Sequence, residues 1–283
     1  ILLQSAQQIP QLKLSALAVG QISLSVLIII YGILLTIWLN KKLQKHWKIS
    51  GLIIIVLLII PIIYKNIFLS KITILQGNSI PMIIIQDRGH VTVLNPGDEA
   101  DINYSLLPFL YQQGVNQIDT MIITNNHHNF SLSDFENKIK IATIINLFDE
   151  DKLTKDQTQI EVNSTRIKAV NQIPLVVEWT SKNQSWLWID SQQKDPNLMI
   201  PTRHQSSEII LWSGKKLSLN WIQSFKTQKV KLVIISTHYL SNFMQKELTK
   251  QNIEWYWIQE IGAIQWIPKQ GLKPLLKNQE QDP

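Results

Sequence analysis

The amino-terminal seventy residues contain no aspartate and no glutamate, and this feature constrains the fold more than any other in the sequence. Within them lie two long apolar runs without a charged side chain, at residues 22–39 and 49–64. A helix of about 18 residues rises ~1.5 Å per residue and approaches the ~30 Å hydrocarbon core of a bilayer. Buried core helices of soluble proteins seldom run this long without a charge, so the pattern predicts two transmembrane helices.

Lysines predict the orientation of this helical hairpin. The connecting loop at 40–48 carries four lysines, whereas the segment after the second run offers Lys65 and Lys71. Because positively charged loops stay in the cytoplasm, we expect the loop there and the chain from residue 71 outside. A signal peptide would be a single span with a small-residue cleavage site, so two spans argue against it. We expect residues 1–70 to be the carboxyl-terminal end of a larger multi-pass membrane domain.

The basic character of the chain, with a net charge of +6, is confined to this membrane part. Six of the 27 basic residues precede residue 71, which leaves 21 basic residues against 21 acidic ones in the remainder. The remainder is therefore not a basic nucleic-acid-binding domain by bulk charge. The chain also has no cysteine, which excludes disulfides and thiolate metal sites.

Residues 71–268 have a different sequence pattern, in which short β-rich runs are separated by turns and helical segments. Strands are predicted at residues 72–75, 80–86, 91–95, 120–124, 142–147, 166–170, 175–179, 186–189, 208–212, 231–236, 254–258 and 263–267. Helices are predicted at residues 104–113, 132–138, 218–225 and 242–251. A strand meander followed by strands that alternate with helices predicts an α/β fold of two mixed sheets covered by helices, an αββα sandwich. Residues 269–283 are predicted to be a polar tail.

Four short motifs follow one another in this part of the chain. They are Gln-Gly-Asn-Ser at 76–79, Val-Leu-Asn-Pro-Gly at 93–97, the stretch 106–119 and Gly-Ala-Ile at 262–264. Their order after a membrane hairpin resembles the extracytoplasmic, metallo-β-lactamase-like domain of the ComEC-type DNA-uptake channels. The resemblance covers nearly the whole chain. It implies a multi-pass protein of the bacterial cytoplasmic membrane, with single-stranded DNA and other competence proteins as partners.

The resemblance also predicts that most of the metal ligands of the family are missing from this sequence. Hydrolytic members of this fold carry Thr-His-x-His-x-Asp-His after a buried strand, and this motif matches the sequence from Thr124 onward. The four functional positions are then occupied by Asn125, His127, Asn129 and Phe130. A catalytic zinc takes three protein ligands, and only the histidine survives. The resemblance therefore implies a fold without its hydrolytic centre, with no catalytic residue, no metal and no cofactor.

Other ligand positions of the family are changed as well. Asn78 and Asn95 stand where the family has aspartate, and residues 208–215, where a His-His pair is expected, contain no histidine. Asp190, followed by Ser191, is the one acid near the place of the bridging carboxylate. One histidine and one aspartate are too few for a catalytic zinc.

The remaining histidines have a structural and a functional interpretation. His127 and His128 either bond within their own turn, which we favour, or form a residual metal site. His204 and His238 are interpreted as surface or loop residues, with metal ligation as the alternative. Ser213 is followed by glycine but lacks the Gly-x-Ser-x-Gly elbow, so a serine hydrolase has no support.

Two tryptophan pairs are the other unusual feature. Trp186 and Trp188, like Trp255 and Trp257, are two residues apart, so each pair lies on one face of a strand. Bases of single-stranded DNA could stack there, at ~1–3 kcal/mol each. No lysine or arginine cluster flanks either pair, so we favour core packing, and the sequence identifies no DNA-binding residue.

Three functions follow from these features. The favoured one is the carboxyl-terminal segment of a ComEC-like channel for uptake of single-stranded DNA in natural transformation, with residues 71–268 as a catalytically dead docking or guiding domain. The second is an active metal-dependent nuclease on a membrane anchor, with ligands that the motif match does not reveal. The third is a membrane-tethered interaction module unrelated to DNA.

Overall fold

The computed structural model describes most of residues 68–275 and part of the segment before them. Upstream, it describes residues 18, 20, 24–40, 51–53, 55–56, 60 and 64. Within the later range, it leaves out residues 79, 125–131, 148–158, 163, 173–174, 191–207 and 215.

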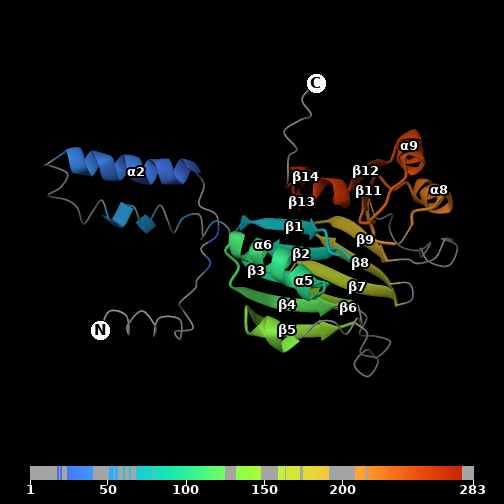
Figure 1. The fold of residues 1–283 in the computed structure, drawn as a ribbon, viewed down its shortest axis with the longest axis horizontal. Helices are drawn as coiled ribbons and strands as arrows, with labels where there is room; N and C mark the ends of the chain where they lie inside the picture. Colours follow the sequence, from blue (N-terminus) through green and yellow to red (C-terminus); the bar gives the residue numbers. More distant parts are fainter. Residues whose placement is uncertain are drawn as a thin grey trace.

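The described residues form two seven-stranded sheets that face each other (Figure 1). The first sheet has the order β14-β13-β1-β2-β3-β4-β5 and the second β12-β11-β10-β9-β8-β7-β6. The strands of the first are β1 (Ser70–Leu75), β2 (Met82–Asp87), β3 (His90–Leu94), β4 (Gln117–Ile123), β5 (Lys140–Asn146), β13 (Ala263–Ile267) and β14 (Gly271–Pro274). Those of the second are β6 (Gln159–Val162), β7 (Thr165–Gln172), β8 (Leu175–Ser181), β9 (Gln184–Asp190), β10 (Ile209–Trp212), β11 (Leu232–Ile235) and β12 (Glu254–Trp257).

Strand direction gives each sheet two distinct edges. In the first sheet β1, β2 and β3 form an antiparallel meander, and β3, β4 and β5 run parallel. Strands β1, β3, β4 and β5 therefore all end at one edge, which we call the carboxyl edge, and begin at the opposite amino edge. In the second sheet β9, β10, β11 and β12 are parallel.

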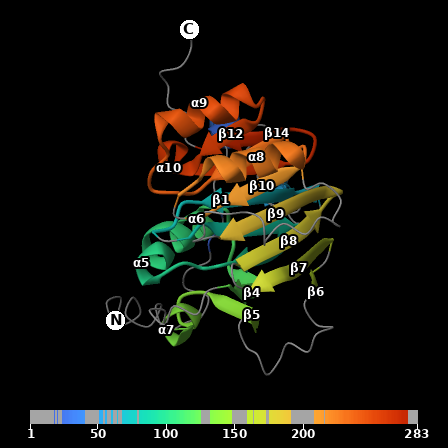
Figure 2. The ribbon, with the colours of Figure 1, turned by 90° about the vertical axis from the view of Figure 1, so that its right-hand side faces the viewer.

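Helices cover the outer face of both sheets (Figure 2). The helices from residue 99 onward are α5 (Glu99–Asp101), the π-helical η2 (Ile102–Leu106), α6 (Leu107–Gln112), α7 (Leu132–Glu136), α8 (Leu219–Thr227), α9 (Asn242–Lys250) and α10 (Ile258–Ile261), whose Ile258 packs in the core between the sheets. Buried residues of η2, α6 and α7 pack on the first sheet, and those of α8 and α9 pack on the second. The predicted αββα order of layers is confirmed for the described residues.

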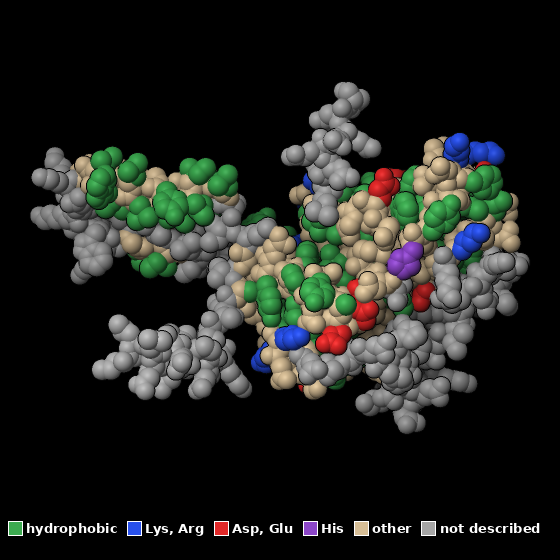
Figure 3. Space-filling view, in the orientation of Figure 1, with side chains coloured by type: hydrophobic (Ala, Val, Ile, Leu, Met, Phe, Trp, Pro, Cys, Tyr) green, Lys and Arg blue, Asp and Glu red, His purple; other side chains and the backbone are tan. Residues whose placement is uncertain are grey.

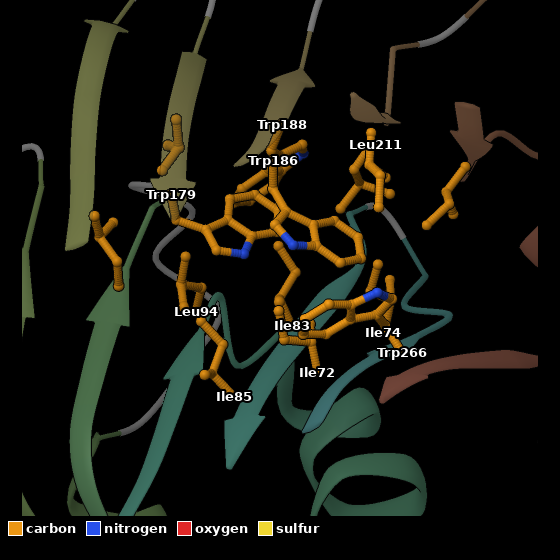
Figure 4. Packing of buried hydrophobic residues seen from close by; sticks show 14 of the residues in the cluster. Ile72, Ile74, Ile83, Ile85, Leu94, Trp179, Trp186, Trp188, Leu211 and Trp266 are labelled. Atoms are coloured by element: carbon orange, nitrogen blue, oxygen red, sulfur yellow. The ribbon is translucent and has the colours of Figure 1, made fainter. Parts of the chain in front are cut away.

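The core between the sheets is built from large aromatic and β-branched side chains (Figure 4). Trp179, Trp186 and Trp188 of the second sheet point at isoleucines of β1 and β2, among them Ile72 and Ile83. Trp186 and Trp188 are fully buried, so the packing interpretation is confirmed for this pair and base stacking there is excluded. Trp255 and Trp257 are partly buried against the core under α8 and α9.

Some predicted boundaries are wrong. The strand predicted at 254–258 ends one residue earlier, at Trp257, and the chain from Ile258 forms the short helix α10, which was not predicted. Gly262 follows this helix with φ +72°. Strand β14 lies inside the predicted polar tail, where it pairs antiparallel with β13. Lys269 and Gly271, both with positive φ, turn the chain back along the sheet. The first sheet therefore extends beyond residue 268.

Helix α2 (Leu24–Leu39) coincides with most of the first predicted span. All of its residues are partly or fully exposed, and apolar side chains gather on the face of this helix that is seen at the left of Figure 3. Most of the second predicted span, 49–64, is not described. Among the described residues, no helix is both long enough and apolar enough to cross a membrane.

Candidate functional site

The carboxyl edge gathers the polar residues that follow the buried strands. Parallel sheets bind ligands at this edge, because the connections after successive strands meet there. On the second sheet, the register of β9, β10 and β11 makes Asp190, Ser213 and Ser236 neighbours along the edge. On the first sheet the turn after β1, Asn95 after β3 and Thr124 after β4 face the same end of the molecule.

Asn95 stands where the resembling family has aspartate, and the structure shows what its side chain does. It is buried, with a left-handed backbone of φ +55°, a region that asparagine tolerates. Its backbone N–H donates to the Ile122 carbonyl at 2.8 Å. Its side-chain Nδ2 donates to the Pro81 carbonyl at 3.0 Å. The amide therefore ties the ends of β2, β3 and β4 together, and the donor that makes this bond is one that a carboxylate lacks.

Replacing Asn95 by aspartate is expected to destabilise the fold by about 1–3 kcal/mol, because a buried carboxylate would face the Pro81 carbonyl without a proton to donate. Chemical denaturation followed by circular dichroism measures this loss. The matched control is Asn252→Asp, which changes an exposed asparagine with φ +57° and is expected to be near neutral. Equal stability of both variants would show that the bond to Pro81 contributes nothing.

Asn78, the second changed position, belongs to a network of turn residues. Its backbone N–H donates to Asp101 Oδ1 at 3.0 Å, and its side-chain Nδ2 donates to Asp98 Oδ2 at 3.1 Å. Asp98 and Asp101 also form a reciprocal capping box at the start of α5. Burial raises the pKa of Asp101, whereas the hydrogen bond from the Asp101 backbone lowers the pKa of Asp98. Both carboxyl groups are thus occupied in holding the turn.

Two glycines let these connections approach each other. A Cβ on Gly77 would lie 2.2 Å from the Ile80 carbonyl oxygen, and one on Gly97, with φ +83°, would lie 2.5 Å from Asp101 Cβ. The motif match found both glycines but missed the roles of Asp98 and Asp101. The signal was present, since two acids three residues apart before an apolar run have the spacing of a capping box.

Side-chain hydrogen bonds join the two sheets at this edge and tie strands of the second sheet to its connections. Ser236 Oγ donates to Gln76 Oε1 at 3.3 Å, which links the second sheet to the turn after β1. Ser213 Oγ accepts from Trp188 Nε1 at 2.7 Å, and the Thr237 carbonyl accepts from Trp257 Nε1 at 2.8 Å. Both serine hydroxyls therefore have structural partners, in keeping with the lack of a serine-hydrolase elbow.

A metal, which the fold implies, does not fit the donors that the structure describes at this edge. No group of three histidine, cysteine, aspartate or glutamate side chains comes together among the residues described. Asp190 is half-buried, His238 is exposed, and Asn78 and Asn95 are neutral and used in turns. Residues 125–130, Ser191 and His204 fall in the stretches left out, so the predicted absence of a metal site stays a prediction.

No protein-family model matches the sequence, and no curated protein sequence matches it either. Solved structures do match the fold. The metallo-β-lactamase fold protein YhfI from Bacillus subtilis has a TM-score of 0.50 and 10% identity, over 70% of this chain and 99% of its own. A diphosphatase from the PhnP family has a TM-score of 0.45 and 12% identity, over 71% of this chain and 99% of its own. Zinc-bound PqqB from Methylobacterium extorquens has a TM-score of 0.42 and 11% identity, over 64% of this chain and 86% of its own.

The likeness to YhfI extends over nearly the whole of that protein. At 10% identity it concerns the fold and carries no activity with it. The part of the chain from β1 to β14 has the metallo-β-lactamase fold.

Proposed function

We propose that this chain is the carboxyl-terminal part of a ComEC-like membrane channel, and that its metallo-β-lactamase-fold domain guides or docks incoming single-stranded DNA without cutting it. The observation that carries the proposal is the hydrogen bonding of the Asn95 side chain. Asn95 stands where the resembling family has aspartate, and its buried side-chain amide donates a hydrogen bond to the Pro81 carbonyl. The strands at the carboxyl edge keep the arrangement of the fold, and the Asn95 side chain stabilises the ends of these strands.

The apolar surface of α2 supports a membrane location. Leu24 and Trp38, near its two ends, are each 73% exposed, and leucines and isoleucines between them are exposed as well. Water-exposed apolar surface costs about 25 cal/mol per Å², so a helix of this kind needs lipid or protein around it. Lipid can cover the apolar side chains on every side of such a helix.

The first test concerns metal and hydrolysis, on the full chain purified in detergent. We expect less than stoichiometric zinc or manganese by elemental analysis, and no cleavage of labelled single-stranded DNA when either metal is added. Zinc-bound PqqB, carried through the same purification, controls for loss of metal during handling. One tightly held metal per chain, together with cleavage that a chelator abolishes, would establish the nuclease alternative instead.

The second test concerns DNA uptake in the cell. Deleting the gene that encodes this chain is expected to abolish entry of labelled DNA into the nuclease-protected fraction, and a plasmid copy is expected to restore it. Undiminished uptake in the deletion strain would contradict the DNA role and leave a membrane-tethered interaction module.

A further inference from the structure

The segment just before α2 is bound to the folded domain by the side chain of Asn116. The backbone N–H of Ala18 donates to Asn116 Oδ1 at 2.7 Å, and Asn116 Nδ2 donates to the Ala18 carbonyl at 2.9 Å. The amide thus exchanges both hydrogen bonds with one residue, as a neighbouring strand would. These residues are 98 positions apart in the sequence, so the contact is a tertiary one.

Two glycines bring the same segment into backbone contact with the domain. Gly20 and Gly114 both have positive φ, at +80° and +72°. A Cβ on Gly20 would lie 2.9 Å from the Gly114 nitrogen and 3.1 Å from its Cα. Real Cβ atoms essentially never come within 3.0 Å of a backbone atom, and the positive φ is also one that favours glycine, so glycine fits best at position 20. We call Ala18, Gly20, Gly114 and Asn116 the amino-edge clip.

The clip lies at the amino edge of the first sheet, because Gly114 and Asn116 directly precede β4. The chain also enters the domain at this edge, where β1 begins at Ser70. Lys71 Nζ donates to Gln113 Oε1 at 2.5 Å, so the entry point and the clip are adjacent. The domain is therefore attached at two neighbouring points on one edge, before and after the membrane part of the sequence.

This edge is opposite to the candidate site. Strand β1 has six residues and spans about 20 Å between the amino and carboxyl edges. In Figure 1, α2 extends from the side where β1 and β4 begin, and the arrows of both strands point away from it. A helix and strands in this arrangement hold the carboxyl edge at the far end of the molecule from α2.

We propose that the amino-edge clip fixes the domain upright on the membrane, with the amino edge facing the lipid surface and the carboxyl edge pointing away from it. The lipid part of this inference rests on the proposed function, whereas the clip itself rests on the contacts of Ala18 and Gly20. A single linker at Ser70 would let the domain rotate freely, but two attachments on one edge restrict it. The carboxyl edge is then open to partners outside the membrane.

Spin-label distance measurements test the clip in detergent, where no bilayer is needed. The chain has no cysteine, so labels can be placed at Leu24→Cys and Lys140→Cys, both exposed, on α2 and at the start of β5. We expect a single narrow distance distribution. Gly20→Ala is expected to broaden it at least about twofold, because the Cβ would clash with Gly114. Asn116→Ala is expected to act in the same direction.

The matched control is Gly32→Ala, since a Cβ at this α2 glycine meets nothing within 4 Å. It is expected to leave the distance distribution unchanged. A distribution that is already broad in the parent chain, or that Gly20→Ala leaves as narrow as Gly32→Ala does, would overturn the clip.

A second readout places the domain relative to lipid. Fluorophores at Lys140→Cys, at the amino edge, and at Tyr239→Cys, an exposed residue after β11, are compared in phosphatidylethanolamine–phosphatidylglycerol vesicles with headgroup-attached quenchers. Quenching is expected to be at least about threefold stronger at position 140, because about 20 Å separates the edges. Equal or stronger quenching at position 239 would overturn the upright orientation. A narrow spin-label distribution without quenching at either site would support the clip and contradict the proposed membrane function.

Discussion

Replacing Trp186 by alanine is expected to lower the free energy of unfolding by about 3–5 kcal/mol. Trp186 is 0% exposed and lies between the two sheets. Its ring stacks on Trp179 with centroids 5.5 Å apart, and it meets Trp266 edge to face at 5.8 Å. The substitution removes these contacts and leaves a cavity that strands held in two sheets cannot close by relaxation.

Urea denaturation of the full chain in detergent, followed by far-ultraviolet circular dichroism, measures this loss without depending on tryptophan fluorescence. The control is Tyr239→Ala, which removes a large aromatic side chain that is 68% exposed. It is expected to change the free energy of unfolding by less than about 0.5 kcal/mol. Similar losses for both variants would mean that Trp186 does not occupy the inter-sheet core.

Replacing Asp87 by asparagine is expected to cost about 3 kcal/mol of stability, because removing one partner of a buried ion pair leaves the other uncompensated. Asp87 ends β2 at the amino edge, where its Oδ1 is 3.3 Å from Lys182 Nζ in the β8–β9 turn. Its Oδ2 accepts a hydrogen bond from the Ser164 hydroxyl, in the β6–β7 turn. One buried carboxylate therefore connects the first sheet to two hairpins of the second.

The same pair predicts a dependence of stability on pH. Burial alone would raise the pKa of Asp87, but hydrogen bonds from Ser164 and Ser70 and the charge of Lys182 outweigh it and lower the pKa below its ordinary value of 3.8. The unfolded chain therefore binds the proton more readily than the folded one. The stabilisation is fully present above the unfolded pKa, and it is lost as the pH falls through the lower folded pKa.

A matched ion pair on the surface provides the control. Glu208 lies 2.7 Å from Lys231 Nζ, and both side chains are largely exposed. Glu208→Gln is expected to change stability by at most about 1 kcal/mol, as exposed pairs usually do. Between pH 7 and pH 3, the difference in stability between Asp87→Asn and the parent chain should stay constant down to the ordinary pKa of 3.8 and shrink below it. A constant difference across that range would show that the Asp87 charge is not what stabilises the fold.

Local sequence predicted those elements whose apolar runs are bounded by turns. The β-branched residues of β1, β2 and β3, the turn at Arg88 and Gly89, and the end of α6 just before Gly114 all lie where the pattern places them. Helix α9 follows its Ser241 cap in the same way. Helix α10 was missed, because a short apolar run such as that around Ile258 suits a helix and a strand equally well.

Weak or short elements were missed for a related reason. Strand β14 has four residues, one of them proline, and little apolar periodicity of its own. It forms because the backbone of β13 provides hydrogen-bonding partners along the side that faces β14. Strand β6 is similar, since it is held by antiparallel pairing with β7. Such pairing depends on neighbours that a local pattern does not contain.

At the candidate site, the motif match located Asn78 and Asn95 but not the contacts that explain them. Asn78 bonds to Asp101, 23 residues away, and Gln76 bonds to Ser236, 160 residues away. The bond between Gln76 and Ser236 follows from how the two sheets stack, and the bond between Asn78 and Asp101 from how the turn after β1 meets α5. No spacing in the sequence encodes either.

The sequence by itself determined the division into an apolar, acid-free segment and an α/β domain, because charge and hydrophobic periodicity are local properties of the chain. It also determined the order of strands and helices that makes an αββα sandwich possible. Only the tertiary structure decided that Trp186 and Trp188 are buried between the sheets, and that Asn116 holds Ala18. Both depend on contacts between residues distant in sequence, which form only when the sheets and the preceding segment come together in space.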